Sequence, residues 1–138
     1  MNVIADTNIL VRLVMEDDAA QTDLAIRTMA EASSVAISPL VLCELAWVLG
    51  RGYAVPRHAI ANAIRSIMET RGVLVDRPAA EAGLAILEAG GDFADGVIAY
   101  QGRWLGGETF VSFDRKAVRL LDENGVSARL LTARTADP

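Results

Sequence analysis

Short apolar runs alternate along the chain with longer segments in which apolar residues recur at helical spacing. The runs predict five strands, at 3–5, 35–37, 73–75, 109–112 and 128–131. The longer segments predict helices at 9–15, 19–32, 39–49, 56–69, 78–89, 92–105 and 115–123, and residues 6–8 form the turn that starts the first. This alternation predicts an α/β fold with a central parallel sheet of about five strands and helices on both faces.

Local signals punctuate these elements and bound the domain. Ser38 followed by Pro39 is typical of a helix start, and Gly50 and Gly52 suit the end of the same helix. Neither a linker nor an internal repeat interrupts the pattern. We therefore expect one domain over residues 1–131 and a polar C-terminal tail over 132–138.

Composition and charge narrow the functional classes. Of the 138 residues, 52% are hydrophobic and 22% charged, which indicates a folded globular chain. The net charge of −5 argues against passive nucleic-acid binding, but not against an enzyme that meets phosphates through metal ions. Cys43 is the single cysteine, and neither a signal peptide nor a membrane span is recognisable. We expect a cytoplasmic protein without a disulfide or a membrane anchor.

Five carboxylates occupy positions where α/β folds place their sites, near the carboxyl ends of strands. Asp6 directly follows the first strand, and Asp114 follows the fourth. Asp92 and Asp95 open a helix three residues apart, so they share one face. Glu44 lies about one and a half turns into the helix that follows the second strand.

Helix capping is the simpler explanation for several of these acids. Asp6, Asp92 and Asp114 stand where N-caps stand, and Asp95 suits the third helical position. Glu44 resists this explanation because its helical neighbours are apolar, and burial without a partner costs several kcal/mol.

A shared metal ion would account for the five acids together. Carboxylates held close together repel one another, and a hard divalent cation relieves that repulsion. An oxygen-only ligand set suits Mg²⁺ or Mn²⁺. Zinc fits less well, since the lone His58 and Cys43 show no ligand spacing.

Four motifs resemble those of the PIN-domain nucleases. They are D-T-N at 6–8, L-C-E-L at 42–45, D-F-A-D-G-V-I-A at 92–99 and S-F-D-R-K at 112–116. Each is weak alone, but together they are similar in order and spacing to the family over nearly the whole chain. Within the family they look most like VapC-type toxins of bacterial toxin–antitoxin pairs.

The resemblance implies a Mg²⁺- or Mn²⁺-dependent endoribonuclease that acts as the toxin of a type II toxin–antitoxin system. By this resemblance the catalytic metal ligands are Asp6, Glu44, Asp95 and Asp114, and Asp92 is an accessory ligand. It implies supporting hydrogen bonds from Thr7, Asn8 and Ser112, and RNA contacts from Arg115 and Lys116. The implied partners are RNA, a VapB-type antitoxin and a second copy of the chain. Gly96 stands where the family often has alanine.

Three alternatives remain open at this point. The first is a PIN-domain RNA-processing nuclease that is not a toxin, and the second is a noncatalytic α/β interaction module whose acids only cap helices. The third, a phosphatase with Asp6 as nucleophile, lacks the second aspartate expected at position 8, where Asn8 stands. Arg12, Arg51, Arg57 and Arg103 are further rim candidates, although plain surface roles explain them as well. Trp47 and Trp104 suit a core or an interface better than base stacking.

Overall fold

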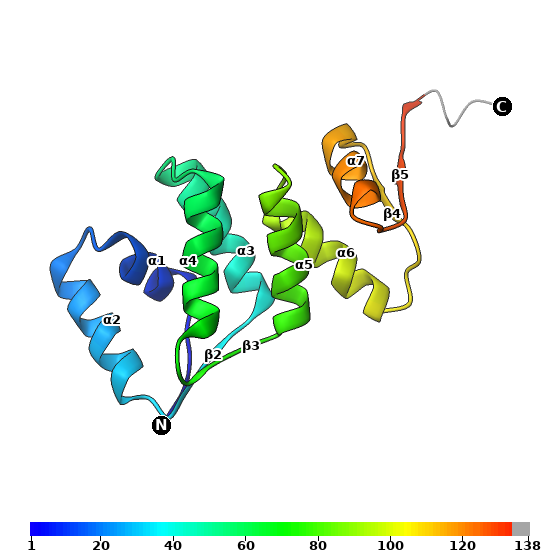
Figure 1. Cartoon of the computed structure of the whole chain (residues 1–138). Coiled ribbons are helices and arrows are strands. Elements are labelled where there is room, and N and C mark those ends of the chain that lie inside the picture. The colour runs from blue at the N-terminus through cyan, green and yellow to red at the C-terminus, as the bar shows by residue number, and fades with distance from the viewer. Residues whose placement is uncertain (134–138) are drawn as a thin grey trace. The chain divides into compact units, whose positions relative to one another are not determined.

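The computed structural model describes residues 1–133 as two compact units, Met1–Ala80 and the part of the chain that begins at Glu81 (Figure 1). The elements in chain order are β1 (Asn2–Ile4), α1 (Thr7–Met15), α2 (Ala19–Glu31), β2 (Ser34–Ile37), α3 (Pro39–Trp47), a π-helix η1 (Val48–Gly52), α4 (Arg57–Glu69), β3 (Val73–Val75), α5 (Arg77–Glu88), α6 (Phe93–Trp104), β4 (Phe110–Ser112), α7 (Arg115–Glu123) and β5 (Ala128–Leu130). The boundary between the units falls within α5, after Ala80.

The first unit is built on a three-stranded parallel sheet of order β1-β2-β3 (Figure 1). Val35 in β2 pairs with Val3 on one side and Val73 on the other. Val35 and Ile37 are buried, as are Leu10 in α1 and Ile64 in α4. The central strand therefore lies in the core of this unit, as its apolar sequence predicts.

The helix after β2 starts where the sequence places it but ends differently. Ser38 Oγ accepts a hydrogen bond from the backbone N–H of Val41 at 3.3 Å, and Pro39 is the first helical residue. The α-helix predicted to reach residue 49 ends at Trp47 and continues as the π-helix η1. At this junction the N–H of Val48 bonds to the carbonyls of both Glu44 and Leu45, and the wider π turn begins with Val48.

The α1–α2 hairpin of the first unit is tied down by polar contacts around Asp17. Arg12 forms an ion pair with Asp17, and the hydroxyl of Tyr53 donates to the other oxygen of that carboxylate at 2.8 Å. The hydrogen bond from Tyr53 and the adjacent guanidinium lower the pKa of Asp17. Arg12, one of the basic rim candidates, is therefore already paired with Asp17 in the α1–α2 hairpin.

The second unit contains a two-stranded parallel sheet, β4-β5, against which α7 packs (Figure 1). Its core contains Ile86 from α5, Ala99 from α6, and Leu120 and Leu121 from α7. Gly96 marks a close approach of α6 to α5, because a Cβ there would lie 2.2 Å from the carbonyl oxygen of Ala82.

The α/β class, the five predicted strands and their parallel pairing are confirmed. The five strands form a three-stranded and a two-stranded sheet, whereas the hydrophobic pattern predicts one central sheet of about five strands. The single domain over 1–131 stays a prediction. Of the tail predicted at 132–138, residues 134–138 lie outside the described residues. Within residues 1–133, no helix combines the length and the apolar character needed to cross a membrane.

Candidate functional site

Asp6 lies in the first unit, between the end of β1 and the start of α1. Its Oδ1 accepts a hydrogen bond from the backbone N–H of Ile9 at 3.1 Å, so the side chain caps α1. The residue is exposed, and its second oxygen remains available to a ligand. Thr7 is partly buried and Asn8 is exposed, and neither side chain hydrogen-bonds to Asp6 among the described residues. Their predicted supporting role stays a prediction.

Glu44 lies in α3, which packs against α1 in the same unit. Its side chain is exposed, and it shares a helical stripe with Leu40 and Trp47, which are 68% and 67% exposed. The expected free-energy cost of burying Glu44 is therefore wrong, because its apolar sequence neighbours do not enclose it. The Glu44 side chain forms no hydrogen bond and caps no helix among the described residues, so the structure shows no stabilising role for it.

The second unit carries Asp92 and Asp95 at the start of α6. Asp92 occupies the N-cap position, but its side chain accepts no capping hydrogen bond. Asp95 follows in the first turn, where its side chain is partly buried. The capping explanation offered for this pair therefore fails for the side chain of Asp92.

Asp114 caps α7 in the second unit, since its Oδ1 accepts from the backbone N–H of Ala117 at 3.0 Å. Ser112 supports this loop, because its Oγ accepts from the backbone N–H of Asp114 at 2.9 Å. The contact reaches the backbone of Asp114 and not the carboxylate. Arg115 and Lys116 are the first two residues of α7 and are both exposed.

The electrostatics of the second unit single out Asp95. Burial raises the pKa of its carboxyl group, and the negative charges of Asp92 and then Asp114 raise it further. Asp95 is thus a partly buried carboxylate whose charged neighbours have the same sign.

The donors fit a hard divalent cation by their chemistry. All are carboxylate oxygens, the ligands that Mg²⁺ and Mn²⁺ prefer, and a cation would offset the repulsion around Asp95. Among residues 1–133, no group of three or more histidine, cysteine, aspartate or glutamate side chains is already arranged to hold a metal ion. The structure brings Asp92, Asp95 and Asp114 within electrostatic range in one unit. In the other unit it places Asp6 at the N-cap of α1 and Glu44 in α3, which packs against α1.

The remaining candidates separate into surface and interior residues. His58 is exposed near the start of α4 and has no ligand partner among the described residues. Cys43 is partly buried, and burial raises the pKa of its thiol to about 11, with a smaller contribution from Glu44. Trp104 is 77% exposed and Trp47 is 67% exposed, so neither lies in the core, and the interface role predicted as the alternative stays a prediction. The hydrophobic pattern could not show that Trp104 is exposed, because it scores a tryptophan in the core and one on the surface alike.

Comparison with known proteins gives one clear result. No curated protein matches the sequence significantly. A model of the PIN domain family matches residues 3–122, which contain every acid named above. The chain therefore belongs to the PIN domain family.

Proposed function

We propose that this protein is a Mg²⁺- or Mn²⁺-dependent endoribonuclease. PIN domains typically are metal-dependent nucleases, which gives the reaction class. The observation that carries the proposal is Asp95, a partly buried carboxylate with like-charged neighbours and no hydrogen-bond partner among the described residues. Repulsion of this kind is what a bound cation relieves.

In this proposal Asp6, Glu44, Asp95 and Asp114 are the metal ligands, and Asp92 is an accessory acid. A bound Mg²⁺ or Mn²⁺ would supply an activated water for attack on a phosphodiester and would stabilise the leaving oxygen. Capping does not compete with this role, because the capping bonds of Asp6 and Asp114 each use only Oδ1. Ser112 would hold the loop of Asp114 in place through its backbone contact.

A noncatalytic interaction module accounts for two of these acids. The side chains of Asp6 and Asp114 cap helices, as that alternative expects. It leaves Asp95 unexplained, since this partly buried acid has no capping bond, whereas the exposed Glu44 needs no structural partner. Substitution of these two residues separates the alternatives, because only the nuclease needs both carboxylates.

RNA cleavage with and without Mn²⁺, together with calorimetric titration of Mn²⁺, tests the proposal. We expect Glu44→Gln and Asp95→Asn to weaken Mn²⁺ binding at least tenfold and cleavage about a hundredfold or more. Asp23→Asn and Asp122→Asn remove exposed acids of the first and second unit and serve as matched controls. Both controls should stay within twofold of the unmodified protein.

Two outcomes contradict the proposal. Undiminished cleavage in both Glu44→Gln and Asp95→Asn would remove these residues from the site. An absence of Mn²⁺ binding and of RNA cleavage in the unmodified chain would favour the interaction module.

The finer assignment is that of a toxin neutralised by a VapB-type antitoxin, acting as a homodimer. It rests on the likeness of the four sequence motifs to VapC-type toxins. Expression should arrest bacterial growth, Asp95→Asn should not, and co-expression of the product of a small adjacent gene should restore growth. Growth that is unaffected by an active nuclease would favour an RNA-processing enzyme.

Arg115 and Lys116 are the proposed phosphate contacts beside Asp114. Each is exposed at the start of α7, next to a proposed ligand. Removing one such contact should reduce the salt dependence of single-stranded RNA binding by about 0.7 in log–log slope. Arg129→Gln, an exposed arginine in β5, should leave that slope unchanged.

A further inference from the structure

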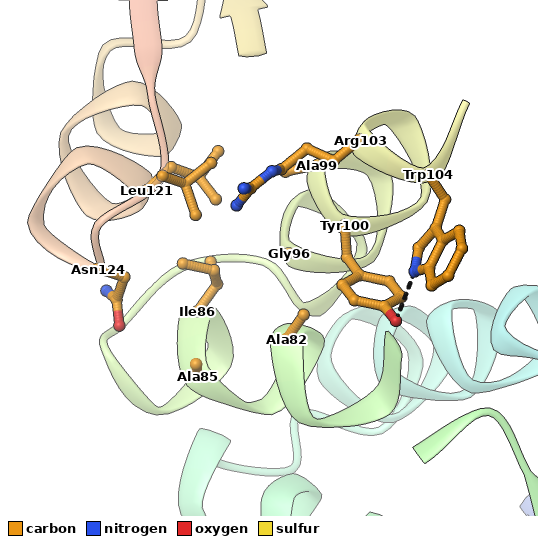
Figure 2. A pocket seen from close by; sticks show the side chains of 11 residues that line it. Ala82, Ala85, Ile86, Gly96, Ala99, Tyr100, Arg103, Trp104, Leu121 and Asn124 are labelled. Carbon is orange, nitrogen blue, oxygen red and sulfur yellow. Dashed lines mark hydrogen bonds between the residues drawn. The ribbon is translucent and has the colours of Figure 1, made fainter. Parts of the chain in front are cut away.

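The second unit contains a hollow of about 570 Å³ lined by α5, α6, α7 and the segment after α7 (Figure 2). Small side chains make up much of its wall, among them Ala82 and Ala85 of α5 and Ala99 of α6. Its volume lies in the range of sites that hold small molecules or single groups of a larger ligand.

The shape of the hollow follows from the sequence of α6. Gly96, Ala99, Tyr100 and Arg103 are spaced as i, i+3, i+4 and i+7, so they form one stripe that faces the hollow. The two N-terminal members are small and leave room, whereas the two C-terminal members are long and planar.

Two aromatic rings are held in a fixed relation at the edge of the hollow. The indole Nε1–H of Trp104 donates a hydrogen bond to the hydroxyl oxygen of Tyr100 at 2.7 Å (Figure 2). Trp104 is 77% exposed despite its size. Because Tyr100 is partly buried and already bonded to Trp104, the pair loses little freedom when a planar ligand stacks on it.

A positive charge also lines the hollow. The side chain of Arg103 extends across the hollow toward Leu121 of α7 (Figure 2). Arg103 forms no ion pair with any residue in the range 1–133, so its guanidinium can bind an anion. Aromatic rings and a guanidinium that line one hollow are typical of sites for single-stranded nucleic acid, in which bases stack and arginine meets the phosphate.

We propose that this hollow binds an unpaired nucleotide of the RNA substrate. Its base lies against the small residues and the aromatic pair, and its phosphate meets Arg103. The inference rests on the proposed ribonuclease function, because α6 also begins with Asp92 and Asp95. Along α6 the rise from Asp95 to Arg103 is about 12 Å, so the bound nucleotide lies only a short way along the RNA chain from the bond that is cleaved. Since a paired base cannot enter the hollow, the enzyme prefers single-stranded RNA.

Trp104 itself reports on the proposed binding. The chain has two tryptophans, so Trp47→Phe leaves Trp104 as the only one. Uridine and adenosine tetranucleotides, added to metal-free protein in EDTA, should quench its fluorescence, and a blunt RNA duplex should not. In this background Arg103→Gln should weaken tetranucleotide binding about tenfold, and Ala85→Phe, which fills the hollow from an exposed position, should do the same.

Matched controls remove charge and add bulk outside the hollow. Arg129→Gln and Ala89→Phe change exposed residues of the same unit that do not line it, and both should bind within twofold of the parent. Unfolding curves confirm that each variant is folded.

The test separates this inference from the proposed function. Cleavage that needs Mn²⁺, together with tetranucleotide binding that Arg103→Gln and Ala85→Phe leave unchanged, would overturn the nucleotide site and leave the nuclease intact. Quenching that these variants abolish, without any Mn²⁺-dependent cleavage, would support the site and remove the catalytic proposal. A change in oligomeric state in Ala85→Phe with unchanged RNA binding would assign the hollow to a second copy and overturn the inference.

Discussion

Gly96→Ala should destabilise the protein although alanine is the better helix former. Alanine in the middle of a helix gains about 1 kcal/mol over glycine. A Cβ at position 96 would, however, lie 2.2 Å from the carbonyl oxygen of Ala82 and 2.9 Å from the Cα of Gly83. These are backbone atoms of α5, so no side chain can rotate away, and α5 and α6 must move apart.

The expected size of the effect follows from these two opposing terms. Overpacking a well-packed contact costs about 1–3 kcal/mol, and a rigid backbone partner places the cost near the upper end. After the gain in helix propensity, the free energy of unfolding should fall by about 1–2 kcal/mol. Gly102→Ala is the matched control in the same helix, because a Cβ there meets nothing within 4 Å. It should raise the free energy of unfolding by up to about 1 kcal/mol.

Urea unfolding of the three metal-free proteins, followed by circular dichroism, measures both changes. The two substitutions should shift the midpoint in opposite directions with similar slopes. A stabilisation by Gly96→Ala as large as that by Gly102→Ala would refute the close approach of the two helices in the second unit.

Three further predictions concern a thiol, a backbone strain and a carboxylate. Burial raises the pKa of Cys43 to about 11, so at pH 8 its thiol in the native protein should react with a disulfide reagent roughly tenfold more slowly than an ordinary thiol, once the higher nucleophilicity of its thiolate is counted, and denaturant should abolish the difference. Ala54 has a φ of 54°, in the left-handed region that strains a residue with a Cβ. Ala54→Gly should therefore raise the free energy of unfolding by about 0.5–1 kcal/mol, and a lower urea midpoint in this variant would contradict the strain. The raised pKa of Asp95 means that the folded state binds this proton more tightly than the unfolded state. Stability should therefore fall as pH rises from the unfolded pKa, about 3.9, through the folded pKa. Asp95→Asn should remove that fall and stabilise the metal-free protein at pH 7, as unfolding at pH 4 and pH 7 would measure.

Helix starts could be predicted because they depend on chemistry within a few residues. Ser38 caps α3 and Asp114 caps α7 through bonds to backbone N–H groups three positions later. The strands could be located for a similar reason, since short apolar runs between turns define them. These signals depend on residues close together in the chain, so a single sequence is enough to identify them.

Exposure was harder to predict because it depends on which face of a helix meets another element. Glu44 is surrounded in sequence by apolar residues, yet Leu40 and Trp47 on its stripe are exposed with it. The π-helix after α3 and the close approach at Gly96 have the same origin, since both depend on packing between elements. The acids of the site could be named from motif order, whereas their surroundings required the structure.

The caps on Asp6 and Asp114 determine how the metal site must be tested. Alanine at either position would remove a capping bond as well as a ligand, and a lost cap alone costs about 1 kcal/mol. A loss of activity in an alanine variant would therefore fit both the nuclease and the interaction module. Asparagine caps a helix about as well as aspartate but carries no charge. Asp6→Asn and Asp114→Asn should thus keep the stability of the metal-free protein and lose Mn²⁺ affinity, and a variant that keeps both would show that its carboxylate serves only the helix.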